Sequence, residues 1–166
     1  MISPSIVNPM GRIVDLQELE RFLPGKSNGK IVLTGGSFDI LHIGHVKFLS
    51  EAKGAGDYLI ILLESDQKVK KLKGSNRPVF IQRERAEMLA ALGSVDLIVL
   101  IPMMENDADY LNLVTKIKPG IIAVTENDPQ IENKRWQAKE VGGELKIIPL
   151  TKTFSTSKLA KILGVE

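Results

Sequence analysis

Two histidines three residues apart carry the clearest chemistry in this sequence. His42 and His45 are the only histidines in the chain. They flank Gly44 at the predicted start of a helix, after a strand over 30–34 and a turn of small residues. Backbone N–H groups and the positive end of a helix bind phosphate at such a turn. Two imidazoles about one helical turn apart can donate to the same phosphate chain. The segment therefore predicts a phosphate-binding site.

Short apolar segments alternate with helical patterns along the chain. Strands are expected at 30–34, 58–63, 96–101, 121–125 and 144–149. Helices are expected at 45–53, 82–92, 108–117, 131–141 and 155–163. The strands are nearly continuous in Ile, Val and Leu, which is typical of strands buried on both faces. The alternation predicts an α/β fold, a Rossmann-like doubly wound parallel sheet of five strands.

The predicted sheet also predicts where a ligand binds. In an open parallel sheet, ligands bind at the carboxyl ends of the strands. Four polar or basic loops fall at that edge, at 34–45, 64–79, 125–130 and 151–157. Upstream, a helix over 15–22 and a Pro-, Gly- and Lys-containing linker over 24–29 predict an N-terminal segment at 1–29. A single domain then follows at 30–166.

Composition excludes several classes of protein. The 166 residues are 43% hydrophobic and 25% charged, which fits one domain with a core. The absence of cysteine excludes disulfides, thiol catalysis and thiolate metal sites. The longest apolar run, 95–104, is too short to span a bilayer, and the first twelve residues lack a secretion-signal pattern. A net charge of +2 does not favour nucleic acid. We expect a cytoplasmic protein without nucleic-acid or membrane partners; a homodimer is compatible with the sequence.

The string GGSFDILHIGH resembles the GxFDxxHxGH signature of a nucleotidyltransferase superfamily. That superfamily includes cytidylyltransferases, sugar-phosphate adenylyltransferases and nicotinate mononucleotide adenylyltransferases. A second motif, the ISTT or ISSS segment that opens the last helix, is similar to the residues at 154–157. The resemblance extends from about Gly11 to the C-terminus. It implies a Rossmann-like fold and transfer of a nucleotidyl group from a nucleoside triphosphate to a phosphate monoester.

The implied reaction assigns roles to the charged residues. A phosphate monoester is largely dianionic at neutral pH, so no general base is required. Catalysis then depends on positioning and on fixed donors for the charge on the phosphates. The resemblance implies that His42 and His45 contact the triphosphate near its α/β bridge. Lys73 and Arg85 would neutralise the β- and γ-phosphates and the acceptor. Mg²⁺ bound with ATP would carry part of the charge.

Further residues are expected to bind the nucleotide, because they belong to the same motifs and loops. They are Gly36, Ser37, Phe38, Asp39, Gly44, Lys71, Glu126, Asn127, Asp128, Ser155, Thr156 and Ser157. Hydroxyl groups at the start of the last helix suit a phosphate or a ribose, and they also suit a helix cap.

Four details indicate the substrates. The loop KLKGSNRPV, and the N-terminal run MGRIVDLQELERF, resemble stand-alone D-glycero-β-D-manno-heptose 1-phosphate adenylyltransferases. Glycerol 3-phosphate cytidylyltransferases carry an arginine before their final motif where this chain has Leu150, which favours ATP over CTP. FDILH lacks the proline usual in mononucleotide adenylyltransferases. The resemblance thus implies ATP and a sugar phosphate as substrates, with pyrophosphate and an ADP-sugar as products.

One loop departs from the heptose enzymes, and it keeps alternatives open. The segment TENDPQ at 125–130 stands where that family has a KGGDY-like sequence, and Trp136 follows at the start of a helix. The alternatives are a glycerol 3-phosphate-type cytidylyltransferase using CTP, an FMN or nicotinate mononucleotide adenylyltransferase, and a nucleotide-binding module without turnover.

Overall fold

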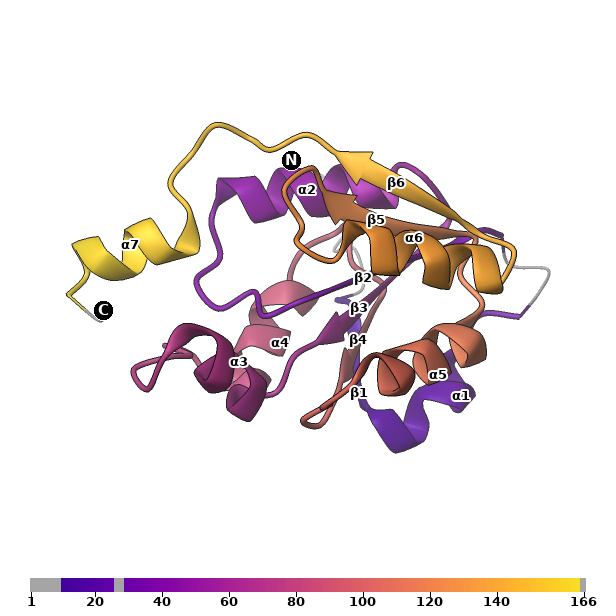
Figure 1. Cartoon of the computed structure of the whole chain (residues 1–166), viewed down its shortest axis with the longest axis horizontal. Coiled ribbons are helices and arrows are strands. Elements are labelled where there is room, and N and C mark those ends of the chain that lie inside the picture. Colours follow the sequence, from indigo (N-terminus) through magenta and orange to yellow (C-terminus); the bar gives the residue numbers. More distant parts are fainter. Residues whose placement is uncertain (1–9, 26–28, 165–166) are drawn as a thin grey trace, which may run out of the picture.

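A parallel sheet of six strands forms the centre of the molecule (Figure 1). The structure is a computed structural model that describes residues 10–25 and 29–164. The order of the strands is β1-β4-β3-β2-β5-β6, and every neighbouring pair is parallel. The strands are β1 (Arg12–Asp15), β2 (Ile31–Gly36), β3 (Tyr58–Leu63), β4 (Leu97–Leu100), β5 (Ile121–Thr125) and β6 (Glu144–Ile148).

Helices cover both faces of this sheet. One face carries α2 (Ile43–Lys53) and α4 (Gln82–Ala90), and the other carries α1 (Leu19–Phe22), α5 (Asp107–Ile117) and α6 (Ile131–Glu140). The remaining helical elements are η1 (Leu16–Glu18), α3 (Asp66–Lys73) and α7 (Thr156–Ile162). None of the helices in the described parts of the chain is both long and apolar enough to cross a membrane.

Strand β3 shows why the sheet is covered on both sides. Leu59, Ile61 and Leu63 pack with the helices of one face, whereas Ile60 and Leu62 pack into the cluster on the other face. All five side chains are buried. Successive side chains of a strand point to opposite faces, so a continuous apolar strand needs a helical layer on each side. The predicted doubly wound α/β fold is confirmed.

The predicted number of five strands is wrong, because the N-terminal segment adds a sixth. β1 pairs with β4 at the edge of the sheet, from Arg12 opposite Leu97 to Asp15 opposite Leu100. The helix expected over 15–22 is a 3₁₀ turn followed by the four-residue α1. Residues 12–22 thus join the sheet and its covering layer. Residues 1–9 and 26–28 of the predicted N-terminal segment lie outside the described residues, as do 165–166.

Two elements at the carboxyl edge also differ from the prediction. Part of the expected loop over 64–79 is the helix α3, whose start is capped by Ser65 Oγ accepting from the Lys68 N–H at 3.2 Å. Only Val69 is buried in this helix, so it lacks the apolar stripe by which helices are predicted. In addition, β2 continues to Gly36, two residues beyond its predicted end.

Candidate active site

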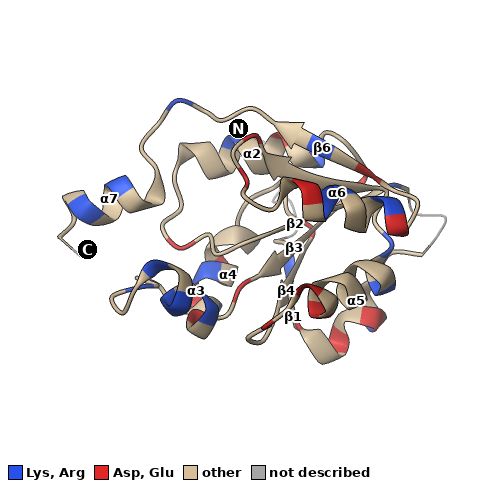
Figure 2. Cartoon of the chain, in the orientation of Figure 1, with Lys and Arg blue, Asp and Glu red and all other residues tan. Residues whose placement is uncertain are grey.

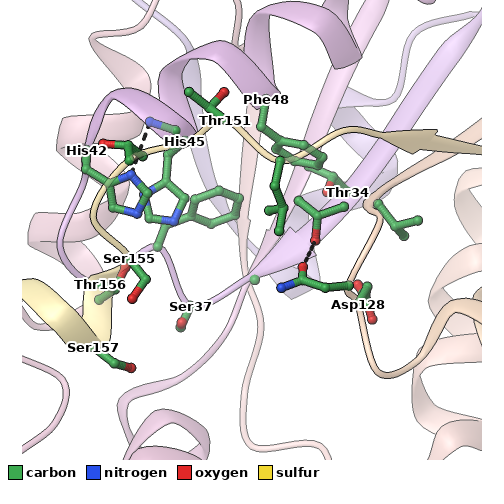
Figure 3. A pocket seen from close by; sticks show the side chains of 18 of the residues that line it. Thr34, Ser37, His42, His45, Phe48, Asp128, Thr151, Ser155, Thr156 and Ser157 are labelled. Carbon is green, nitrogen blue, oxygen red and sulfur yellow. Dashed lines mark hydrogen bonds between the residues drawn. The ribbon is translucent and has the colours of Figure 1, made fainter.

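The two histidines lie at the junction of β2 and α2, at the carboxyl edge of the sheet (Figure 3). His42 is the N-cap of α2, and its Nδ1 accepts a hydrogen bond from the Gly44 N–H at 3.1 Å. The His45 ring is stacked on the His42 ring, with 3.9 Å between the ring centroids. The ring of Phe38 meets His45 edge-on at 5.3 Å. The local cap and the two ring contacts therefore fix both imidazoles in place.

Burial makes these imidazoles neutral at physiological pH. Burial, with smaller contributions from the nearby His42 and Lys73, lowers the pKa of His45 to about 4. Burial also lowers the pKa of His42. Because the Nδ1 of His42 accepts a hydrogen bond, its proton is on Nε2, which leaves Nε2–H as a donor. His45 Nδ1 is buried and has no hydrogen-bond partner among the described residues.

Gly44 lets the histidines and the last loop approach each other. A Cβ at this position would lie 2.8 Å from His42 Cε1 and 3.1 Å from Thr153 Cγ2. The first of these distances is shorter than normal contact, so a side chain here would push the His42 ring away. Glycine is thus required by close packing rather than by an unusual backbone angle.

A cavity of about 480 Å³ opens beside the histidines. Its walls come from the ends of β2 and β5, from the segment that follows β6, from α2 and α3, and from the start of α7 (Figure 3). The predicted site residues that line it are Gly36, Ser37, Phe38, His42, Gly44, His45, Lys73, Asn127, Asp128, Ser155, Thr156 and Ser157. Residues from all four predicted loops thus meet in one cavity.

Arg85 lies outside this cavity. Its side chain is fully buried, and the guanidinium donates to the backbone carbonyls of Ser37, Glu64 and Phe80 and to Asp66 Oδ1 at 2.7 Å. Through these bonds Arg85 ties together the segments that follow β2 and β3. Its contact with the phosphates stays a prediction.

Asp39 is also an anchor, although it was expected to bind the nucleotide. The side chain is fully buried. Its Oδ2 accepts from Arg77 Nε at 2.6 Å, and its Oδ1 accepts from the N–H groups of Val79 and Phe80 at 2.8 and 3.2 Å. These bonds fasten the turn after β2 to the segment that precedes α4. The carboxylate has no face toward the cavity.

Several lysines lie on α3 (Figure 2), and their side chains have different partners. Lys71 Nζ pairs with Glu105 at 3.0 Å on the surface, and Lys68 Nζ donates to the Met104 carbonyl at 2.8 Å. Only Lys73 of this helix lines the cavity. Lys71 does not line the cavity, and its binding to the nucleotide stays a prediction.

Glu126 lies outside the cavity as well. Its Oε1 accepts from the Leu150 N–H at 3.0 Å, which joins the loop after β5 to the segment after β6. Asp128 does line the cavity, with Oδ2 paired to Lys134 at 2.6 Å and Oδ1 accepting from the Gln130 N–H. The loop after β5 thus contributes Asp128 to the cavity wall, with both carboxylate oxygens bonded to nearby protein groups.

The sequence did not reveal Phe48 of α2 in the first cavity, nor a second cavity of about 310 Å³. The second cavity lies on the α5 and α6 side of the β2 end, where it is lined by Glu64, Tyr110 and Lys134. The two cavities share one wall, formed by Thr34, Gly35, Gly36, Ser37, Lys73 and Asp128. Tyr110 on α5 and Lys134 on α6 lie on the face of the sheet opposite α2, and spacing in the sequence could not link them to the histidine motif.

A Rossmann-like sheet with paired histidines over a glycine turn defines the nucleotidyltransferase class of phosphate site. Residues 33–159 match the family described as cytidylyltransferase-like. The chain belongs to this cytidylyltransferase-like family.

Individual relatives give the same picture. The chain is 38% identical over 155 residues to the bifunctional protein HldE of Campylobacter concisus, covering 90% of this chain and 30% of that protein. It is 44% identical over 137 residues to the bifunctional protein HldE of Nitrobacter winogradskyi, covering 81% of this chain and 27% of that protein. The chain thus spans about a third or less of the length of these relatives.

Solved structures are similar as well. The lipopolysaccharide core biosynthesis protein from Thermoplasma volcanium is 27% identical with a TM-score of 0.60, over 76% of this chain and 99% of that chain. The pantoate-beta-alanine ligase from Francisella tularensis is 16% identical with a TM-score of 0.63, over 86% of this chain and 68% of that chain. The second likeness concerns the fold alone.

Proposed function

We propose that this chain transfers AMP from ATP to a sugar phosphate, most specifically to a heptose 1-phosphate, and releases pyrophosphate. One observation carries the proposal: two cavities meet at a shared wall that contains the glycine turn and Lys73. The cavity beside the histidines would hold ATP, and the other would hold the acceptor. Their phosphates would then meet at the shared wall.

The transfer is a direct displacement. A phosphate oxygen of the acceptor attacks the α-phosphorus of ATP, and a new P–O bond forms. The bond from the α-phosphorus to the bridging oxygen breaks, and its electron pair leaves with pyrophosphate. The product is an ADP-sugar. The acceptor phosphate is already largely dianionic at neutral pH, so no residue has to remove a proton.

The protein then supplies position and charge stabilisation. His42 and His45, neutral and held by their ring contacts, donate N–H groups to phosphate oxygens without rearranging. Lys73, on the shared wall, offsets charge on both phosphate groups. Fixed donors of this kind are effective because their orientation is set before the substrate arrives.

The site fits a magnesium ion that enters bound to the phosphates of ATP. The described residues hold no group of three or more His, Asp or Glu side chains that could bind a metal ion. Asp128, the one carboxylate in the wall of the first cavity, is already bonded to Lys134. Mg²⁺ keeps waters and phosphate oxygens as ligands in such sites. The ion would thus arrive on ATP and offset charge on its phosphates.

The acceptor class has two supports. The KLKGSNRPV loop, which resembles heptose 1-phosphate adenylyltransferases, contributes Lys73 to the shared wall. One protein of similar structure is a lipopolysaccharide core biosynthesis protein, and lipopolysaccharide contains sugars. Both favour a sugar phosphate. CTP with glycerol 3-phosphate is the second candidate, because the family that matches is described as cytidylyltransferase-like.

The test is pyrophosphate release from ATP and from CTP with a panel of acceptors. The panel is D-glycero-β-D-manno-heptose 1-phosphate, glycerol 3-phosphate, FMN and nicotinate mononucleotide. We expect turnover with ATP and the heptose phosphate, and none when the acceptor is omitted. Turnover confined to CTP and glycerol 3-phosphate would establish the second candidate. Nucleotide binding without pyrophosphate release from any pair would contradict the proposal and favour a binding module.

Proton uptake on ATP binding tests the role of His45. The pKa of His45 is about 4 in the free protein. A neighbouring anion raises the pKa of an imidazole, so at pH 5 ATP binding should draw a proton onto this ring. At pH 8 the ring stays neutral and takes up none. Calorimetry in two buffers of different ionisation enthalpy measures the uptake.

The control for that experiment is His45→Asn, which removes the titrating ring and retains a polar side chain. ATP itself exchanges protons in this pH range, and the variant reports that contribution alone. We expect the wild type to take up more protons than the variant at pH 5 and the same number at pH 8. Equal uptake at pH 5 would show that no phosphate approaches His45.

A further inference from the structure

The second cavity contains a buried carboxylate with one unused oxygen. Glu64 follows β3 directly, and its Oε1 accepts a hydrogen bond from the Tyr110 hydroxyl at 2.9 Å. Its Oε2 is buried and has no hydrogen-bond partner among the described residues. A buried acceptor without a partner is costly, and such a group in a native structure calls for an explanation. A ligand in the cavity would supply the missing donor.

Tyr110 holds this carboxylate in its orientation. Burial, together with the adjacent Glu64 carboxylate, raises the pKa of the Tyr110 hydroxyl, so the phenol remains a donor at every physiological pH. Its bond to Oε1 leaves Oε2 as the free acceptor. Lys68 Nζ lies 5.6 Å from the centroid of the Tyr110 ring and also bonds the Met104 carbonyl. Tyr110 is therefore a positioning residue.

The rest of the cavity wall is divided between apolar and polar groups. Its apolar part comes from Leu33, Leu62, Val69, Leu72, Val114, Ile122 and Ala123. Its polar groups include the Lys134–Asp128 pair, whose atoms are 2.6 Å apart, and Lys73 at the wall shared with the first cavity. An apolar wall beside a few fixed polar groups is typical of a small-molecule site. The C–H faces of a sugar can pack on the apolar wall, while its hydroxyls form hydrogen bonds with the polar groups.

The charges around Glu64 select the kind of donor. Burial raises the pKa of the Glu64 carboxyl, whereas the positive charges of Lys68, Lys134 and Arg85 oppose this rise. Positive charge is therefore already present around Oε2, and a neutral hydroxyl can donate to this oxygen without bringing another charge into the cavity. An anionic phosphate would be attracted toward Lys73, so an acceptor with hydroxyls at one end and phosphate at the other matches both ends.

We propose that Glu64 selects the acceptor by accepting a hydrogen bond from one of its hydroxyls, so that the second cavity binds polyhydroxylated phosphates. This inference rests on the proposed function in one respect, that the ligand of the second cavity is the acceptor substrate. The selectivity itself is a binding property of the cavity and can be measured without turnover. A site built to bond a hydroxyl rejects an analogue that lacks it, since the buried polar group is then left unpaired. Glu64 thus determines specificity, and Lys73 and the histidines serve the transfer.

The experiment compares two ligands that differ in their hydroxyls. Binding of D-glycero-β-D-manno-heptose 1-phosphate and of cyclohexyl phosphate to the full chain is measured by calorimetry. Both ligands carry a six-membered ring and a phosphate, but only the first carries hydroxyls. We expect the wild type to bind the heptose phosphate at least about 10-fold more tightly, on the scale of a hydrogen bond to a charged group. Glu64→Leu should remove most of this preference without changing the affinity for ATP.

Two further variants separate the hydrogen bond from general damage to the fold. Glu64→Gln keeps the shape and an acceptor for Tyr110 but places an amide where Oε2 accepts, so it should weaken heptose phosphate binding selectively. Glu87→Gln is the matched control, because Glu87 lies on the exposed side of α4, where its Oε1 is 3.7 Å from Arg83 Nε. It should leave both affinities unchanged. Thermal unfolding of each variant verifies that the chain is folded.

The outcomes distinguish this inference from the proposed reaction. If the wild type shows the preference, and Glu64→Leu and Glu64→Gln lose it, the inference holds even where no pyrophosphate is released. If the wild type binds the two ligands equally, or fails to bind the heptose phosphate, the inference is wrong. It is also wrong if folded Glu64→Leu and Glu64→Gln keep the preference, although turnover of the heptose phosphate would then still support the proposed reaction.

Discussion

Replacement of His45 by alanine is expected to lower kcat about 10²-fold or more and to leave the affinity for ATP nearly unchanged. The side chain is held by the stacked His42 ring and by the edge of Phe38, so its donor group is already oriented when ATP binds. A preorganised donor of this kind stabilises charge that develops in the transition state more than charge in the bound substrate. The loss therefore falls on kcat rather than on KM.

The measurement is steady-state pyrophosphate release at saturating acceptor, with ATP affinity determined separately by calorimetry. His45→Gln serves as a partial rescue, because its amide retains an N–H donor on a side chain of similar reach. We expect Gln to recover part of the rate lost by Ala. A His45→Ala enzyme that keeps most of the wild-type rate would show that the catalytic assignment is wrong. A loss of ATP affinity with kcat unchanged would indicate a binding role alone.

The location of the site could be predicted because its signals are local in sequence. The strand, the glycine turn and the N-capping His42 occupy consecutive positions, and the turn fixes its own geometry through the Gly44 N–H bond. The convergence of the four loops followed from parallel strand direction, which brings carboxyl ends to one edge. Spacing and topology were sufficient for these features.

Partners distant in sequence could not be predicted in the same way. Asp39 and Arg85 are charged residues within or near the motifs, and charged groups beside a phosphate site suggest ligand contact. In the structure both side chains are buried, and their hydrogen-bond partners lie 19 to 48 residues away in the sequence. The one nearer partner is the Phe80 carbonyl, which is five residues before Arg85. Sequence pattern cannot state whether a charge is paired internally or offered to a ligand.

The same limit applies to single residues within a segment. Lys71 and Lys73 are two positions apart on α3, and residues at that spacing face different directions on a helix. Only the helical geometry, which the sequence did not reveal, separates the cavity-lining Lys73 from the surface pair of Lys71 with Glu105. β1 was missed for a related reason, since it has four residues and only Val14 is buried.

The buried pair of Asp39 and Arg77 gives the largest effect expected on stability. Asp39→Ala should lower the free energy of unfolding by about 3–5 kcal/mol, because it removes one partner of a fully buried ion pair, the carboxylate that accepts from Arg77 Nε. Two backbone N–H groups, those of Val79 and Phe80, would lose their acceptor as well. For a chain of this length the melting temperature should fall by roughly 6–20 °C.

Thermal and urea unfolding measure this loss, and a second pair provides the control. Glu87→Ala breaks the exposed ion pair between Arg83 and Glu87, whose loss should change stability by no more than about 0.5 kcal/mol. Asp39→Asn should lie between the two, since an amide keeps one acceptor but removes the charge. If Asp39→Ala were as stable as the wild type and had lost only its affinity for ATP, Asp39 would be a ligand-binding residue, as the motif alone suggested. A large loss of stability would instead mean that this motif position supports the phosphate site from within the core, by fastening the turn after β2 to the segment that precedes α4.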